Sequence, residues 1–184
     1  MDDIAAGHPG APWRMANVRP VIESPWLGLQ LADVTKPSGA VEEHYLVRLP
    51  EAVMVVVLDA PGEHVLLAWR HRCVPDLWSY ELPGGLLEDG EEPADAARRE
   101  VAEETGCTVR ELRHLVTFEP AVGSVASPHH VFLARGVDRI GEPTERDEGI
   151  FEWIPLARTR QLIAERQLGN SGTLIGLLHV LAHR

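Results

Sequence analysis

Apolar residues along the chain mostly follow the two-residue period of β-strands, and three stretches with helical spacing interrupt this pattern. Residues 52–58, AVMVVVL, are continuously apolar and rich in β-branched side chains, which predicts a central strand buried on both faces. Alternating apolar and polar positions between Gly, Pro, Asp and Ser predict further strands on both sides of it. The predicted strands are residues 26–34, 44–49, 52–58, 64–70, 78–82, 109–118, 130–134 and 151–154.

The first stretch with helical spacing, residues 93–105, has the sequence PADAARREVAEET. Pro93 suits a first helical turn because its missing N–H would have no intrahelical partner there. Gly106 suits the left-handed residue that commonly ends a helix. Apolar residues at helical spacing predict two more helices near the C-terminus, at residues 157–168 and 173–183.

This order of elements predicts an α/β fold, an α/β/α sandwich with a mixed sheet and an extra N-terminal strand pair. A length of 184 residues fits one domain with a small appendage. We therefore predict a flexible, Gly/Pro/Ala-rich N-terminus at residues 1–17, the strand pair at residues 18–50, and the main α/β domain at residues 51–184.

Composition narrows the possible partners. The formal net charge of −11 and the isoelectric point near 5.2 argue against general binding to nucleic acid or to an anionic membrane, because both need a basic surface. The two cysteines are too few for a disulfide framework, and no apolar run reaches transmembrane length. The acidic, proline-broken start is unlike a signal peptide, so we predict a cytoplasmic protein.

Three glutamates mark the chemistry of the first helix. Glu100, Glu103 and Glu104 lie at positions i, i+3 and i+4, so a helix places them on one face within a single turn. Like charges at this spacing repel and need a cation to offset them. Hard divalent ions such as Mg²⁺, with Mn²⁺ as an alternative, take oxygen ligands from carboxylates and substrate phosphates. A purely solvated helix face is the simpler alternative, and the glycine pair Gly84-Gly85 just upstream argues against it because it lets backbone approach a ligand closely.

The spacing of this segment resembles a known family motif. The segment that begins at Gly85 is similar to the Nudix box. Glu91 follows Gly85 after five residues, and after seven more comes Arg99-Glu100-Val101-Ala102-Glu103-Glu104-Thr105-Gly106. Only Cys107 departs from the box, at a position where an aliphatic residue is usual. The resemblance implies a Nudix-like fold and a catalytic domain over residues 51–184. It also implies metal binding through the Gly84 carbonyl, Glu100, Glu103 and Glu104, with Glu103 also catalytic and with Gly85, Glu91, Arg99 and Gly106 in structural roles.

Outside the box, the resemblance implies further site residues. A glutamate in a late loop often acts as general base in the ADP-ribose pyrophosphatase branch, which suggests Glu148 first and Glu145 second in the loop before residue 151. Arg70 or Arg72 takes the place of a substrate-binding arginine of that branch, and a surface salt bridge is the alternative role for this arginine. The sequence Glu81-Leu82-Pro83-Gly84-Gly85 is similar to the Glu-Leu-Pro-Ala-Gly segment of those enzymes.

The function implied is hydrolysis of the pyrophosphate linkage in a nucleoside diphosphate linked to a group X, with ADP-ribose or a related nucleotide-sugar as substrate. Two alternatives stay open: a pyrophosphohydrolase of nucleoside triphosphates or dinucleoside polyphosphates, and a non-catalytic nucleotide-sensing module. The N-terminal strands are similar in layout to the dimerisation sheet of the ADP-ribose branch, which implies a homodimer.

Overall fold

The computed structural model describes residues 10–145 and 147–183, and the chain divides into two compact units. Unit 1 comprises residues 10–49 and 121–126, and unit 2 comprises residues 50–120 and 127–183. The division falls between Leu49 and Pro50, so most of unit 1 precedes unit 2 in the sequence. The loop at residues 121–126, which lies within the sequence of unit 2, also belongs to unit 1.

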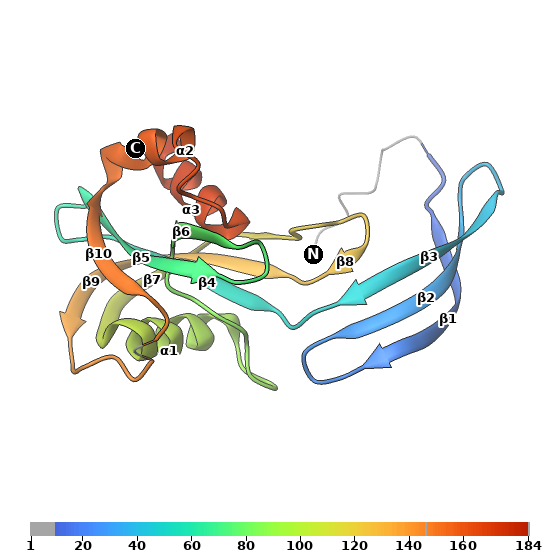
Figure 1. The fold of residues 1–184 in the computed structure, drawn as a ribbon, viewed down its shortest axis with the longest axis horizontal. Coiled ribbons are helices and arrows are strands. Elements are labelled where there is room, and N and C mark those ends of the chain that lie inside the picture. Colours follow the sequence, from blue (N-terminus) through green and yellow to red (C-terminus); the bar gives the residue numbers. More distant parts are fainter. Residues whose placement is uncertain (1–9, 146, 184) are drawn as a thin grey trace. The chain divides into compact units, whose positions relative to one another are not determined.

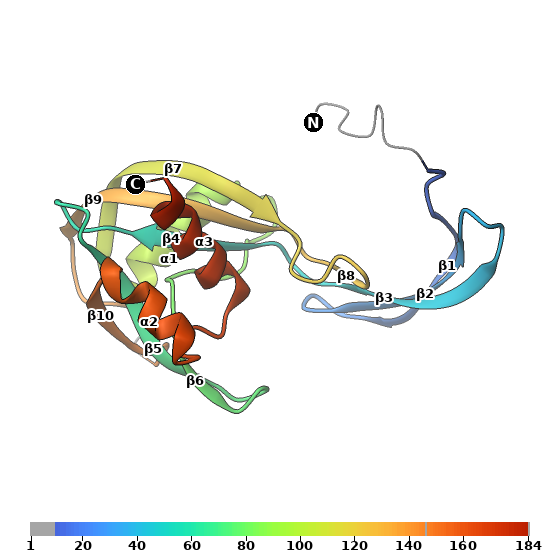
Figure 2. The same ribbon diagram turned by 90° about the horizontal axis from the view of Figure 1, so that it is seen from above.

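Unit 1 is a four-stranded sheet in the order β1-β2-β3-β8 (Figure 2). The pairs β1/β2 and β2/β3 are antiparallel, whereas β8 pairs in parallel with β3. The predicted strand pair is therefore part of a larger sheet that also includes a strand from the loop at residues 121–126. The strands are β1 (Arg14–Glu23), β2 (Gly28–Thr35), β3 (Val41–Arg48) and β8 (Val125–Ala126).

The strand β1 begins within residues 1–17, the segment predicted to be flexible, so residues 14–17 belong to a strand that was not predicted; residues 1–9 lie outside the described residues. The alternation of apolar and polar residues is weak here because the β1/β2 register shifts twice, between Ala16 and Arg19 and between Pro20 and Ile22. Asn17 has a positive φ of 50° at the first irregularity. Such bulges break the two-residue period on which the prediction depended.

Unit 2 contains two three-stranded sheets, β10-β5-β6 and β4-β9-β7. The first sheet is fully antiparallel, whereas in the second β4 pairs in parallel with β9 and β7 pairs antiparallel with it. The strands are β4 (Ala52–Val57), β5 (His64–Arg72), β6 (Leu77–Glu81), β7 (Cys107–Phe118), β9 (His129–Arg139) and β10 (Ile150–Pro155).

The strand β4 separates two hydrophobic cores. All six of its residues are buried, and residues 53–57 alternate between two clusters of side chains. Val53, Val55 and Val57 pack in the cluster that contains Ala97 and Val101 of the helix α1 (Pro93–Thr105). Met54 and Val56 pack in the cluster formed with the C-terminal helices (Figure 1). This confirms the α/β/α sandwich and the central strand buried on both faces.

The helix α1 begins and ends as predicted. Pro93 lies in its first turn, and Gly106 ends it with φ 68° while its N–H donates to the carbonyl of Ala102. A Cβ on Gly106 would lie 2.4 Å from the carbonyl oxygen of Gly141, so the loop before β10 packs directly against this helix end. The C-terminus of α1 and the loop that follows β9 are therefore held together.

The predicted helix at residues 157–168 is shorter in the structure. It is a 3₁₀ turn (Leu156–Arg158) followed by α2 (Thr159–Ala164), and Arg166 then takes a positive φ of 58°, which ends helical geometry. The last helix, α3 (Ser171–Ala182), matches the prediction closely, and the side chain of Asn170 caps it by accepting a hydrogen bond from the Thr173 N–H. Within the described ranges, every helix is too short or too polar to span a bilayer.

Candidate active site

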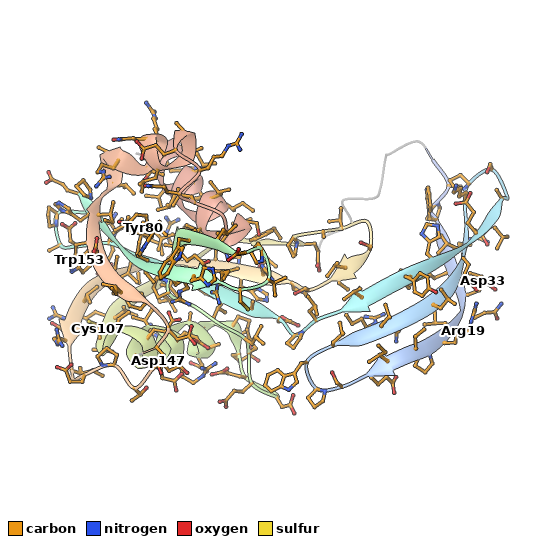
Figure 3. The ribbon with its side chains drawn as sticks, viewed as in Figure 1. Arg19, Asp33, Tyr80, Cys107, Asp147 and Trp153 are labelled. Atoms are coloured by element: carbon orange, nitrogen blue, oxygen red, sulfur yellow. The ribbon has the colours of Figure 1, made fainter. Side chains whose placement is uncertain are left out.

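The centre of the site is a group of three glutamates from two segments of unit 2. Carboxylate oxygens of Glu100, Glu104 and Glu145 lie within 4.8 Å of one another. Glu100 and Glu104 project from successive turns of α1 and are buried, whereas Glu145 is exposed in the loop between β9 and β10. Asp147, labelled in Figure 3, belongs to the same loop. The site thus combines one turn of α1 with a loop some forty residues later.

Backbone hydrogen bonds hold this loop against α1. The N–H groups of Thr144 and Glu145 both donate to the carbonyl of Glu103, at 2.9 and 3.2 Å. That carbonyl lies in the last turn of α1, where carbonyls lack helical partners. The loop therefore satisfies the helix end and carries the Glu145 carboxylate to the cluster.

Burial changes the ionisation of the cluster. It raises the pKa of Glu104 to about 7, although the neighbouring Arg70 and the N–H of Gly84 oppose the shift. Burial also raises the pKa of Glu100, against the lowering effect of Arg99. Buried carboxylates that face one another favour the neutral form unless a cation compensates them. The oxygen donors and their excess negative charge therefore fit a hard divalent ion such as Mg²⁺.

The glycine pair before the box brings backbone against these carboxylates. The N–H of Gly84 donates to Oε2 of Glu104 at 3.0 Å, and a Cβ on Gly84 would lie only 2.1 Å from the carbonyl oxygen of Val53. A Cβ on Gly85 would lie 2.6 Å from Oε1 of Glu100. Any side chain at either position would displace β4 or a cluster carboxylate, so both positions require glycine.

Arg99 connects α1 to the preceding loop. Its guanidinium donates to both carboxylate oxygens of Glu91, each at 2.9 Å, and to Oε1 of Glu100 at 2.8 Å. It also donates to Oε2 of Glu103 at 2.9 Å and to the carbonyl of Leu86 at 3.0 Å. Hydrogen bonds to Glu91 are the largest cause that raises the pKa of Arg99, and the same contacts lower the pKa of Glu91. Arg99 and Glu91 thus have the positions that a structural role requires.

Glu103 is separated from the cluster by this network. Its carboxylate accepts from Nη1 of Arg99, one helical turn earlier, and is not one of the three grouped carboxylates among the described residues. The spacing of Glu103 on the helix face is as predicted, but its side chain turns toward Arg99. In this conformation, Glu145 takes the third place, which was predicted for Glu103.

Arg70 joins the cluster to the second loop glutamate. Its Nη2 donates to Oε1 of Glu104 at 2.9 Å, and its Nη1 donates to Oε2 of Glu148 at 3.1 Å. The side chain of Arg70 is only 5% exposed, and its Nε has no partner among the described residues. Of the two loop glutamates considered as a base, Glu145 therefore lies with the carboxylates, and Glu148 lies with Arg70.

Arg72 lies beside a cavity of about 420 Å³ between the β5–β6 hairpin and the loop before α3. It donates from Nε and Nη2 to the carboxylate of Glu81, with its shortest contact at 2.7 Å. Glu81 is buried and also accepts from the hydroxyl of Ser79 at 3.2 Å. Unlike Arg70, Arg72 is partly exposed, which leaves part of its guanidinium accessible from the cavity.

A second cavity, of about 340 Å³, opens beside the carboxylates. It contains one cation that the sequence reasoning missed, Arg139, which pairs with Glu142 at 2.9 Å. No local motif marks Arg139, because it reaches the site only through the length and register of β9. The residues that line this cavity are Glu104, Thr105, Arg139, Glu142, Pro143, Glu145, Gly149 and Phe151.

Cys107, the one departure from the box pattern, packs as a small apolar residue. It is half-buried against the cluster of Val53 and Val101, and its Sγ lies 3.6 Å from the carbonyl of Thr105. The thiol therefore fills the place of an aliphatic side chain.

Comparison with known proteins shows the family and the fold. The model of the NUDIX domain matches residues 48–171. The chain is 46% identical over 170 residues to CMP-5'-(N-acetyl-N-hydroxy-3-aminopropyl)phosphonate hydrolase of Streptomyces rubellomurinus, covering 92% of this chain and 82% of that protein. It is 34% identical over 157 residues to ADP-ribose pyrophosphatase of Bacillus subtilis, covering 84% of each. The crystal structure of an ADP compounds hydrolase superposes with a TM-score of 0.80 at 19% identity, covering 96% of each chain, which shows a shared fold.

Proposed function

Since the chain belongs to the Nudix hydrolases, close to their ADP-ribose pyrophosphatase branch, we propose that it hydrolyses a phosphoanhydride between a nucleoside monophosphate and a second phosphoryl-bearing group, with the help of a divalent cation. The observation that carries this proposal is the group of Glu100, Glu104 and Glu145, whose oxygens lie within 4.8 Å of one another. ADP-ribose or a related nucleotide-sugar is the first candidate substrate.

Glu100, Glu104 and Glu145 would hold the cation, with the backbone of Gly84 next to them and Glu103 available if it leaves Arg99. A bound Mg²⁺ or Mn²⁺ supplies charge neutralisation at the phosphate oxygens and acidifies water. Arg99 keeps the α1 carboxylates in place through its contacts with Glu91, Glu100 and Glu103.

Arg72, Arg139 and Glu148 complete the proposed site. Arg72 and Arg139 are partly exposed beside the two cavities, so their guanidinium groups can pair with substrate phosphates. Glu148 is partly exposed beside Arg70 and is one candidate to accept a proton from water, and Glu145 is the other. Arg70 would position these glutamates and not contact the substrate, because its Nη1 and Nη2 both donate hydrogen bonds to glutamates.

A second candidate substrate is a CMP-linked phosphonate. The relative that hydrolyses such a compound is 46% identical to this chain, compared with 34% for the ADP-ribose pyrophosphatase. Both substrates carry a nucleoside monophosphate joined by an anhydride to a second phosphorus centre. The two differ in the base and in the group beyond that centre, which the residues of the two cavities would distinguish.

The test is a substrate panel with Mg²⁺ or Mn²⁺ and product identification by mass. Its members are ADP-ribose, a CMP-activated alkylphosphonate, a nucleoside triphosphate and a diadenosine polyphosphate. AMP with ribose 5-phosphate, or CMP with free phosphonate, would support the proposal and identify the substrate class. Faster turnover of the triphosphate or polyphosphate would favour the alternative, a pyrophosphohydrolase of nucleoside triphosphates or dinucleoside polyphosphates. Tight binding of these compounds without any cleavage would favour the sensing module and overturn the proposal.

We also propose that unit 1 forms a homodimer interface. Every residue of β1 is exposed, and large apolar side chains remain accessible elsewhere in the unit, among them Trp13 at 57% and Trp26 at 71%. Patches of this kind usually mark contact surfaces. Sedimentation equilibrium should give a dimer, and Ile22→Glu, which places a charge on β1, should shift it toward monomer. A monomeric wild-type protein at micromolar concentration would overturn the dimer.

A further inference from the structure

A groove on unit 2 gathers four arginines, although the protein as a whole is acidic. The cavity, about 530 Å³ in volume, lies at the edge strand β7 beside β9 and α1. We call it the arginine groove. Its lining residues are Arg98, Arg110, Glu111, Leu112, Arg113, Leu133 and Arg135.

The charge of the groove is only partly balanced. Arg110 pairs with Asp138 through two bonds of 2.6 Å, and Glu111 adds one more carboxylate. Within residues 10–145 and 147–183, Arg98, Arg113 and Arg135 take part in no ion pair. Two carboxylates therefore face four guanidinium groups, and this local positive excess stands in a chain with a formal net charge of −11.

The sheet register brings two of the unpaired arginines together. In the β7/β9 ladder, Glu111 lies opposite Arg135 and Arg113 lies opposite Leu133. Arg113 and Arg135 are therefore diagonal neighbours on one face of the sheet, within reach of each other for long side chains. Glu111 lies on the same face but forms no ion pair with either arginine among the described residues, and an anion between the two arginines would relieve their repulsion.

Arg98 is held at the groove by the strand. Its Nη1 donates to the carbonyl of Val109 at 2.7 Å, which fixes the guanidinium beside β7. Arg99, the next residue of α1, points instead to Glu91 and Glu103. Successive residues on a helix diverge by about 100°. The arginine groove and the carboxylate cluster therefore use different faces of α1.

We propose that the arginine groove binds the phosphate group of a nucleotide-sized metabolite, at a site separate from the carboxylate cluster. The planar fork of arginine matches two phosphate oxygens at once, which makes it suited to phosphate recognition. The volume is in the range of small-molecule sites, and Leu112 and Leu133 offer apolar surface to the organic part of the ligand. A long nucleic acid is disfavoured because its remaining phosphates would meet an acidic protein.

The experiment measures binding of AMP and of inorganic phosphate to the whole protein by calorimetry at low salt in EDTA. Without a divalent ion, the carboxylate cluster repels anions, so binding reports on the groove. The double variant Arg113→Gln/Arg135→Gln should weaken AMP binding about tenfold or more, because two charge-assisted hydrogen bonds are lost. Substrate turnover in the absence of AMP should stay unchanged, because neither residue lies in the catalytic machinery.

A matched control is Arg158→Gln/Arg160→Gln, which removes the same charge from exposed positions outside the groove. It should leave the AMP affinity within about twofold of wild type. Equal loss in both double variants would overturn the proposal, because general charge would then explain the binding. It would also be overturned if the wild type bound neither probe in EDTA, if only Glu104→Gln altered AMP binding, or if a short oligonucleotide bound more tightly than AMP.

Discussion

Arg70 and Glu104 form a buried ion pair in which Nη2 of the arginine lies 2.9 Å from Oε1 of the glutamate. The arginine comes from β5 and the glutamate from α1, and both side chains are almost fully enclosed. The pair therefore joins the β10-β5-β6 sheet to the helix that carries the carboxylate cluster.

Removal of the arginine should be costly. We expect Arg70→Gln to lower the free energy of unfolding by about 3–5 kcal/mol at pH 8, because an uncompensated buried carboxylate remains. Urea denaturation would measure the loss. The exposed pair Arg110–Asp138 provides the control, and Arg110→Gln should leave the urea midpoint nearly unchanged. A midpoint for Arg70→Gln equal to that of the control would contradict the structural role of the pair.

The raised pKa of Glu104 predicts a pH dependence of stability in EDTA. The folded carboxyl keeps its proton up to a pKa of about 7, whereas the unfolded one loses it near 4.5. Between these two pH values the folded state binds a proton at Glu104 that the unfolded state does not bind. The contribution of Glu104 to the free energy of unfolding therefore falls as the pH rises from 4.5 to 7. The loss is roughly 3 kcal/mol. Urea midpoints between pH 5 and 8 should decline less in Glu104→Gln, and identical slopes would exclude the shift.

Replacement of a cluster glutamate by the neutral glutamine should lower activity through loss of cation binding and leave the fold intact. We expect Glu100→Gln to reduce kcat by about 100-fold or more, since it removes a proposed cation ligand. Asp95→Asn, at an exposed position in the first turn of the same helix, should keep wild-type turnover. Steady-state kinetics with Mg²⁺, together with circular dichroism, would check both, and full activity of Glu100→Gln would remove it from the site.

The two loop glutamates should behave differently. Glu145 groups with Glu100 and Glu104, so Glu145→Gln should weaken Mn²⁺ affinity, as measured by calorimetry. Glu148 contacts Arg70, so Glu148→Gln should keep Mn²⁺ affinity and change the pH–rate profile if it accepts a proton. A profile altered only by Glu145→Gln would assign that proton transfer to Glu145.

A single methyl group should disturb the cluster. In Gly85→Ala the new Cβ would lie 2.6 Å from Oε1 of Glu100, and the carboxylate would have to move. We expect weaker Mn²⁺ binding and lower kcat in a folded protein. Gly123→Ala, where no atom lies within 4 Å of the new Cβ, is the control and should behave as wild type.

Local signals made α1 and the α/β/α sandwich predictable from the sequence. Pro93, Gly106 and the spacing of the glutamates determine the helix within a few residues, and the unbroken apolar run of β4 reflects burial on two faces. The strand β1 was missed because bulges interrupt its alternation.

The partners of the site residues depend on contacts between distant segments. Arg70 and Glu104 are 34 residues apart, and no sequence period indicates that they meet. Glu103 shares its helix face with Glu100 and Glu104, yet a hydrogen bond to Arg99 decides where its carboxylate points. Side-chain direction within a charged network is set by competition among several partners, and the sequence alone does not rank them.

The contact of Gly84 with the backbone of Val53 has an evolutionary consequence. Gly84, the first residue of the proposed site, lies directly on the fully buried strand β4, with no side chain between them. The buried strand β4 therefore sets the position of Gly84, whereas Glu145 and Arg139 lie on or next to a surface loop. If the proposed site is correct, mutation can change the loop, and with it the range of substrates, while the segment at Gly84 stays where β4 holds it.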